Sequence, residues 1–394
     1  MVKGTFLSPC QIVTRSLVAK YYTIECRSTK YGKFELSAGI GGLIGVLFGA
    51  LSFINGSDGF YGTLPKWGFS YLMLGSIYFP IAYLIHKFVF DPDHDQALIQ
   101  KAFGAIPIHD IYKGMNDGDV KLEQSSVCKL CSNKTWIVVC MQGITGAMPW
   151  PALGLLLYYF QLMQIDDFLA IFISSAVAIG AALGGFIGGK LGDYAYKRNP
   201  KYGRIVVSHV SVTVGIPLVA VYLYCIPVTS NWWPLYAALG VFTGTLISWS
   251  APCNTAMLSD TFDKLTFPFA YGVEQMLEGA IAAWAPTMVA AFATSIFGVT
   301  DLQDFDLKTD EERVSDINGL GNSMFIICAA GWGLCSLSMF GMYYTYPKDS
   351  LSLREAYVNN VEMVSEPAPA EIVPNDPETN MFQITVANQD TLSI

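Results

Sequence analysis

Long apolar runs separated by polar segments dominate the pattern of this chain. Each of eight runs lasts roughly 20 residues or more, which is enough for a helix to cross the ~30 Å hydrocarbon layer of a membrane. The predicted spans are Phe34–Ile54, Trp67–Phe90, Thr135–Met163, Phe168–Lys190, Arg204–Ile226, Trp232–Ala251, Phe267–Phe297 and Asn322–Tyr344. The pattern therefore predicts an all-α membrane protein with eight transmembrane helices.

Prolines interrupt two of these spans. Pro149 and Pro151 lie inside the third, and Pro286 lies inside the seventh. Proline removes a helical hydrogen bond and clashes with the preceding turn, so we expect a kink or break at both places. Irregular backbone at membrane depth is tolerated where it lines a cavity or is buried in protein.

Composition supports a polytopic membrane protein. The 394 residues are 52% hydrophobic and 14% charged, with a mean hydropathy of +0.40, whereas a soluble domain carries about 25% charged residues. The formal net charge of −9 argues against a nucleic-acid partner. Nine cysteines are scattered without the spacing of a disulfide framework or a four-ligand zinc site.

Lysine and arginine predict the orientation. If the N-terminus is cytosolic and the spans alternate, 20 of the 23 basic residues fall on the cytosolic side. The other three are Lys66, Lys308 and Arg313, the last two in an acidic outer loop, Asp301–Asp316. The positive-inside rule then places both termini in the cytosol. The membrane concerned, plasma membrane or organelle, stays open.

One loop carries a recognisable motif. Gly189-Lys-Leu-Gly-Asp193 is followed by Lys197, Arg198 and then Gly203-Arg204. This run resembles the signature loop of the major facilitator superfamily, with extra residues between Asp193 and the closing glycine. The resemblance covers about Phe34 to Tyr344 and is closest to the spinster-like and uncharacterised plant or protist branches.

The resemblance implies how the chain is divided. In the family the motif follows the second helix of each six-helix half, so the visible spans would be the fifth to twelfth helices, without the first four. Residues 1–33 are then a cytosolic segment, with Arg15–Lys33 as a loop, and 34–90 are a two-helix remnant of the N-terminal half. A cytosolic linker (91–134) precedes a C-terminal six-helix bundle (135–346) and a disordered acidic tail (347–394), which a partner domain could read.

Asp193 and Arg204 are the candidate gate residues. The resemblance implies that Asp193 caps the N-terminus of the first visible span, near Phe34–Leu36, where the helix dipole favours an anion. Arg204 would pair with Asp193 or a neighbouring acid. The alternative is that the basic residues of the loop only determine topology.

Glycines spaced by four form two candidate packing ridges. They are Gly41, Gly45 and Gly49 in the first span and Gly180, Gly184 and Gly188 in the fourth. Such spacing lets helix backbones approach closely. The family's fifth and eighth helices face each other, so we predict that these two ridges touch.

Glu274 and Glu278 are the only pair of acids within a span. They lie four residues apart on one helix face, with Glu278 roughly 16 Å deep if the helix starts at Phe267. An intramembrane carboxylate is by default functional. Glu278 would accept protons or bind a cationic or hydroxylated substrate; in the structural alternative, helix hydroxyls or His209 satisfy it.

Four further residues are weaker candidates for lining a substrate cavity, because small-molecule sites combine aromatic and polar groups. They are Gln142, Trp150, Asn254 and Trp284. The sequence shows no nucleotide-binding loop, nucleophile–base pair or metal-ligand cluster, so neither an enzyme nor a cofactor or metal is expected.

Together with these patterns, the resemblance to the major facilitator superfamily implies a secondary active transporter. It would move a small organic solute or lysolipid-like amphiphile across the lipid bilayer by alternating access, with protons as the candidate coupling ion in symport. The alternative is a non-transporting paralogue that acts as a membrane scaffold or as a partner of a full-length homologue.

Overall fold

The computed structural model describes residues 2–54, 66–88, 130–264, 266–299 and 309–365. All secondary structure in these residues is helical. Contacts divide the chain into two units, residues 1–351 and 352–394. The predicted linker (91–134) and tail (347–394) lie largely outside the described residues.

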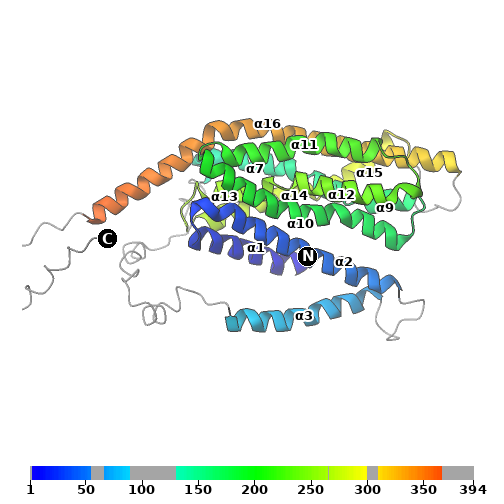
Figure 1. Ribbon diagram of the computed structural model, residues 1–394, viewed down its shortest axis with the longest axis horizontal. Coiled ribbons are helices and arrows are strands. Elements are labelled where there is room, and N and C mark those ends of the chain that lie inside the picture. Colours follow the sequence, from blue (N-terminus) through cyan, green and yellow to red (C-terminus); the bar gives the residue numbers. More distant parts are fainter. Residues whose placement is uncertain (1, 55–65, 89–129, 265, 300–308, 366–394) are drawn as a thin grey trace, which may run out of the picture. The chain divides into compact units, whose positions relative to one another are not determined.

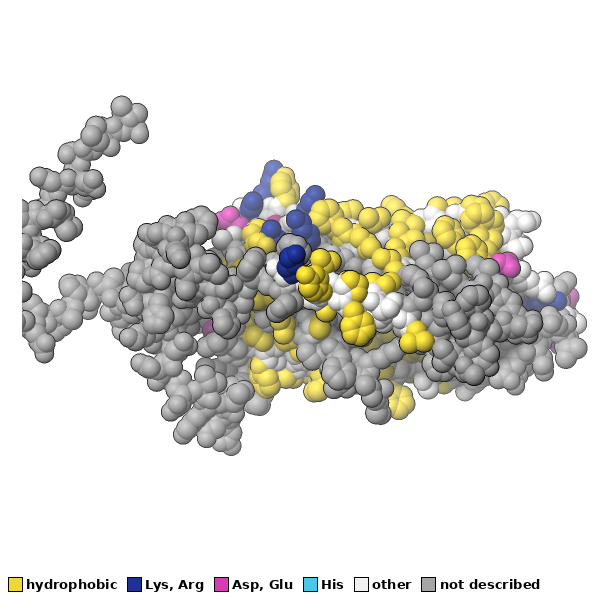
Figure 2. Space-filling model, turned by 90° about the horizontal axis from the view of Figure 1, so that it is seen from below, with side chains coloured by type: hydrophobic (Ala, Val, Ile, Leu, Met, Phe, Trp, Pro, Cys, Tyr) yellow, Lys and Arg dark blue, Asp and Glu magenta, His cyan; other side chains and the backbone are white. Residues whose placement is uncertain are grey.

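Five helical stretches among the described residues are long and apolar enough to span a membrane. They are Lys134–Leu162, Asp167–Arg198, Gly203–Tyr224, Phe267–Ser295 and Glu311–Ser352. Apolar side chains also cover much of the described surface visible in Figure 2, with lysines and arginines gathered mainly toward one end. On the last stretch Leu337, Phe340 and Tyr344 are each more than 60% exposed, as expected of side chains that face lipid.

The N-terminal segment is more ordered than predicted. Helix α1 (Val2–Tyr21) is followed by a short 3-10 turn, Ile24–Cys26, and then by α2 (Arg27–Ile54). The expected loop at Arg15–Lys33 is therefore wrong: most of it is helical, and α1 packs against both α2 and α14 (Phe267–Ala282). Helix α3 (Lys66–Phe88) contacts α2.

The two proline-interrupted spans are broken as predicted. The third consists of α7 (Lys134–Ala147), α8 (Pro149–Leu153) and α9 (Leu156–Leu162). The seventh consists of α14 and α15 (Ala285–Ser295), with Pro286 in the first turn of α15. In both cases proline occupies a first-turn position, where its missing N–H costs nothing.

The sixth predicted span, by contrast, is not one helix. It is divided into α12 (Trp233–Ile247) and α13 (Ser250–Ser259). At the break, the Trp249 backbone N–H leaves the helical ladder and donates to the Ser211 hydroxyl at 3.1 Å. A hydroxyl on the neighbouring helix thus satisfies a backbone donor that would otherwise be unpaired in the interior. Because five described stretches are long and apolar enough to span a membrane and the sixth predicted span is divided, the count of eight spans stays a prediction.

Helix α10 (Asp167–Arg198) occupies the centre of the first unit. It contacts α2, α9, α11 (Gly203–Tyr224), α12 and α13, and several of these helices run alongside it in Figure 1. Asp166 caps its first turn by accepting from the Phe168 N–H at 3.1 Å. Its glycine- and alanine-rich sequence allows many neighbours to approach it closely.

Helix α16 (Asp310–Ser365) begins earlier and ends later than its predicted span. A capping box starts it: the Thr309 N–H donates to the Glu312 carboxylate at 2.9 Å, and the Glu312 N–H donates to the Thr309 hydroxyl at 3.4 Å. The second half of the predicted acidic loop is therefore helical. So is the first part of the predicted disordered tail, from Pro347 to Ser365.

Candidate gate and substrate site

A buried ion network lies at the end of the bundle at which α10 ends and α11 begins, here called the basic end. Asp260, just after α13, accepts from Arg27 at 2.8 Å and from Arg204 at 2.6 Å. Arg204 also donates to Asp193 at 3.0 Å. Two acids and two bases from four helical segments thus form one neutral cluster, here called the gate network.

The remaining hydrogen-bonding capacity of the two arginines is largely used. Arg27 donates to the backbone carbonyls of Ala19, Tyr22 and Ser259 at 2.8–3.2 Å. Arg204 donates to the carbonyl of Ile24 and stacks 4.1 Å from the centre of the Tyr196 ring. These contacts matter because a buried charge is tolerated only when it is both paired and hydrogen-bonded.

Helix α16 joins the gate network through one hydroxyl. Tyr346 is buried and donates to Asp260 at 3.0 Å. One turn later, Asp349 accepts from the backbone N–H and the hydroxyl of Thr135 in the first turn of α7, at 2.8 and 2.6 Å. The C-terminal part of the last span is therefore attached to the basic end at two points.

Asp193 caps the first predicted span, as expected. Its two carboxylate oxygens accept from the backbone N–H groups of Ser28 and Thr29 at 3.0 and 2.7 Å. The cap lies earlier in the sequence than the predicted Phe34–Leu36, because α2 begins at Arg27. The pairing of Arg204 with Asp193 is also confirmed.

Other residues of the motif have different surroundings. Lys197 and Arg198 are exposed at the end of α10, where Arg198 stacks on Tyr194. Gly189 faces the backbone of Ser28, and Gly203 faces the backbone of Ala195, so a side chain at either position would clash with a carbonyl oxygen. The glycines of the motif are therefore needed for close packing, and its outer bases remain at the surface.

Lys264 lies beside the gate network without joining it. The pKa of its ammonium is lowered mainly by partial burial, and further by the positive charges of Arg27 and Lys20. A third base placed here is therefore held less firmly in its charged form than a fully solvated lysine.

The sequence did not single out Arg27 and Asp260. In the sequence Arg27 is one of the basic residues that predict the orientation, and Asp260 follows the sixth predicted span without a motif around it. Its one sequence signal is an acid placed directly after an apolar helix.

The predicted contact between the two glycine ridges is wrong. Gly41 and Gly45 face open space, while Gly180 and Gly184 pack against the backbone of α12 and Gly188 packs against Trp249. Nothing is described around Gly49.

Helices α2 and α10 do pack together, but through different residues. The contacts are made by Gly32, Gly39, Ala182, Gly185 and Gly189. Helix α10 carries a second glycine stripe, Gly185 and Gly189, offset by one residue from the predicted ridge. This second stripe faces α2, whereas Gly180 and Gly184 of the predicted ridge face α12.

The acid pair of α14 is held by an amide. The Gln275 side-chain amide donates to Glu274 at 3.0 Å and to Glu278 at 2.9 Å. Glu274 is only 5% exposed, and the Glu278 carboxylate lies directly over Gly143 of α7. His209 does not neutralise the pair: its ring nitrogens contact Ser336 and Tyr343 of α16.

Gln142 and Asn254 meet in the interior. The Asn254 amide donates to the Gln142 carbonyl at 3.0 Å, and Asn254 accepts from the Ser208 hydroxyl at 2.7 Å. The Cys335 thiol also points at the Gln142 carbonyl, at 3.6 Å. Cys335 also interacts electrostatically with Glu278, so this polar chain lies near the acid pair.

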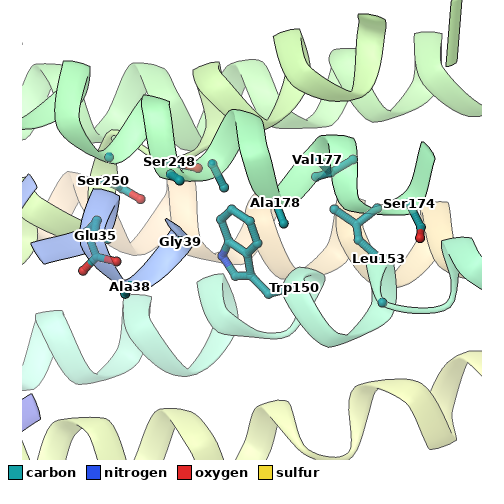
Figure 3. A pocket seen from close by; sticks show the side chains of 15 residues that line it. Glu35, Ala38, Gly39, Trp150, Leu153, Ser174, Val177, Ala178, Ser248 and Ser250 are labelled. Carbon is teal, nitrogen blue, oxygen red and sulfur yellow. The ribbon is translucent and has the colours of Figure 1, made fainter. Parts of the chain in front are cut away.

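A cavity of about 460 Å³ lies between α2, α8, α10 and the α12–α13 break. Figure 3 shows Glu35 and Ala38 at one end, Trp150 in the middle, and Leu153 and Ser174 at the other. Of the four predicted cavity residues only Trp150 lines it. Trp284 is 64% exposed and does not line this cavity.

Glu35 is paired with a residue of α1. Arg15 donates to one Glu35 oxygen at 2.6 Å and to the Thr255 hydroxyl at 2.9 Å, and it lies 5.0 Å from the centre of the Tyr271 ring. No sequence motif selects this pair, and the family resemblance predicts a loop around Arg15.

The described residues contain no group of three or more histidine, cysteine, aspartate or glutamate side chains able to hold a metal ion. One pair of cysteines, Cys128 and Cys131, has CxxC spacing in the sequence; Cys131 is exposed and Cys128 lies outside the described residues. Comparison with known proteins finds no matching family model and no matching curated protein.

Proposed function

We propose that the chain is a secondary active transporter of the major facilitator type, with both termini cytosolic and the basic end as its cytosolic gate. The observation that carries the proposal is the gate network and its position relative to the cavity. Along α10 the cavity extends from Ser174 to Gly185, which is about 16 Å, and Asp193 lies about 12 Å beyond Gly185. The network therefore closes one of the two ends from which a solute could reach the cavity.

An ion network suits a gate because its two states can have similar free energies. Burying charges costs desolvation energy that the ion pairs only roughly repay, so replacing such a network by apolar groups is often neutral or stabilising. When the gate opens, water solvates the four charges and recovers the cost. A gate of this kind therefore closes specifically and still opens.

The helix architecture provides places where the bundle can bend. Breaks at Met148, Ser248–Trp249 and Ala283–Trp284 interrupt helices around the cavity and the acid pair. The close glycine contacts of α10 allow neighbouring helices to shift without large side chains between them. Both features are typical of alternating access, in which bundles rock about a central site.

Glu278 is the proposed proton site. It is half-buried, about 16 Å from the start of α14, and shares the Gln275 amide with Glu274. Two carboxylates this close repel each other when both are charged, and one proton removes the repulsion. Protonation of this pair is therefore a means of coupling transport to a proton gradient.

Uptake by proteoliposomes tests the proposal. The full chain is reconstituted and offered labelled solutes of four classes: organic amines, carboxylates, sugars and lysophospholipids. We expect saturable uptake of at least one class above that of empty liposomes. A correctly folded chain that takes up none of them would refute transport by this chain and favour the scaffold alternative.

A further inference from the structure

The charges around Arg15 do not balance. Arg15 is the one base of a cluster that contains Glu35, Glu274 and Glu278 among the described residues. The gate network, in contrast, has two acids and two bases. Even when the Glu274–Glu278 pair holds one proton, that pair and Glu35 carry two negative charges against one guanidinium. An excess of negative charge in a poorly solvated region is stabilised by an additional cation.

The cavity reaches this cluster at Glu35. One Glu35 oxygen accepts from Arg15, and the other accepts no hydrogen bond from any residue that the structure describes. The side chain of Glu35 is 26% exposed and lines the cavity. A carboxylate has about four lone-pair sites, so Glu35 can accept a second positive partner without losing the first.

The remaining walls favour an apolar body. Trp150 presents its indole in the middle of the cavity (Figure 3), and Ala178, Ala181 and Ala182 of α10 form a wall of small side chains. Ser174, Ser248 and Ser250 add hydroxyl groups. An aromatic side chain near a carboxylate is a combination that recognises ammonium groups, because cations are attracted to the face of an indole ring.

From these contacts we infer that the cavity binds a compact organic cation, with its ammonium beside Glu35 and its apolar part against Trp150. A volume of about 460 Å³ is at the lower end of the range for small-molecule sites and suits a single ring or a short alkyl chain. This inference names the substrate class of the proposed transporter and so rests on that proposal.

Arg15 sets the condition under which the cation binds. Arg15 donates to the Thr255 hydroxyl and lies over the ring of Tyr271, which is one helical turn from Glu274 in α14. Arg15 also interacts electrostatically with both Glu274 and Glu35. When an ammonium group approaches Glu35, Arg15 retains a second carboxylate partner. The cation therefore shares Glu35 with Arg15, and the guanidinium keeps Glu274 as a further electrostatic partner.

Binding of labelled benzyltrimethylammonium to the purified full chain tests this inference. The competitors are the unlabelled cation, the neutral N-benzylacetamide and the anionic phenylmethanesulfonate. We expect saturable binding that the cation displaces at least about tenfold more effectively than either analogue. Absence of binding, or equal displacement by all three compounds, would overturn the inference.

Variants identify the site. Ala178→Phe fills the cavity and should abolish binding, whereas Leu183→Phe, on the same helix but at a 43% exposed position, should leave it unchanged. The double variant Arg15→Gln/Glu35→Gln removes both charges, so no charge is left without a partner at that pair, and it should weaken binding about tenfold or more. Unchanged binding in both the Ala178→Phe and the double variant would place the cation elsewhere and refute this site.

The binding and uptake assays can refute the cation site and the transporter proposal separately. Saturable uptake of a carboxylate or sugar without cation binding would overturn the inference and leave the transporter proposal intact. Cation binding that depends on Glu35, in a chain that takes up no solute, would support the site and refute transport.

Discussion

Asp260→Asn is the most informative change to the gate network. Asp260 is fully buried and accepts from Arg27, Arg204 and Tyr346 at 2.8, 2.6 and 3.0 Å. Asparagine has nearly the same shape but no charge, and its amide nitrogen cannot accept. The substitution would leave two buried guanidinium groups with Asp193 as the one remaining acid of the network.

The magnitude follows from the burial. Removing one partner of a buried ion pair costs about 3–5 kcal/mol, and this cost applies to the closed gate only, because water solvates the arginines when the gate opens. At 1.4 kcal/mol per factor of ten, the closed state should lose about two to three and a half orders of magnitude in population relative to the open state. Tyr346→Phe removes one hydrogen bond to a charged acceptor and should cost about 1.5–3 kcal/mol.

Cysteine labelling measures this shift. Ala251→Cys places a thiol in the cavity wall, and a membrane-impermeant maleimide is applied from the side of the basic end. The protein in which Ala251→Cys is made keeps its four buried cysteines and carries serine in place of the other five, so that the new thiol is the one that reacts. The replaced residues are Cys10, Cys26, Cys128, Cys131 and Cys225. We expect Asp260→Asn to raise the labelling rate strongly, and Asp193→Asn to raise it less, because asparagine can still cap α2.

A labelling rate that Asp260→Asn leaves at the wild-type value, with the fold retained, would refute the gate. Lys197→Gln is the matched control. It removes a charge from the exposed end of α10, at the same end of the bundle but outside the network, and should change nothing.

Three further changes test other parts of the account. Gly184→Ala should destabilise the chain by about 1–3 kcal/mol, because its Cβ meets a backbone carbonyl of α12. Gly45 faces open space, so Gly45→Ala should be neutral or stabilising by up to about 1 kcal/mol. Thermal unfolding in micelles compares the two variants, and equal destabilisation would contradict the packing described. Glu278→Gln should remove the pH dependence of uptake, and uptake that still varies with pH in this variant would exclude Glu278 as the proton acceptor. Trp150→Ala should weaken cation binding about threefold to thirtyfold, while Trp284→Ala, whose side chain is 64% exposed, should not; equal losses would place the aromatic contact elsewhere.

The sequence predicted those features that depend on local chemistry. Proline positions anticipated the breaks before α8 and α15, because the missing N–H acts within one turn. The motif anticipated the capping role of Asp193 and its pairing with Arg204. These interactions require only that one loop meets the start of one helix.

Features that depend on which helix faces meet were not predictable from this sequence. The glycines of α10 form two adjacent stripes, and the spacing alone does not say which stripe faces α2 and which faces α12. Asp260 and Arg15 likewise acquire their partners through tertiary contacts, across more than 200 residues in the pairs Arg27–Asp260 and Arg15–Thr255. The break at Trp249 has a local mark, Pro252 in the first turn of α13, which cannot donate to the Ser248 carbonyl. The hydroxyl that satisfies the freed Trp249 N–H belongs to another helix and could not be read from the sequence.

The central claim is that the basic end is the cytosolic gate. Opening there requires the contact of Asp193 with the start of α2 to break, so α2 and α10 should separate at this end. Spin labels at Lys33 and Lys197, both exposed and outside the gate network, report this separation as a distance distribution by pulsed electron resonance in lipid nanodiscs. We predict two populations in the unmodified network and a strong shift to the longer distance in Asp260→Asn. A single distance that Asp260→Asn does not change would contradict the account.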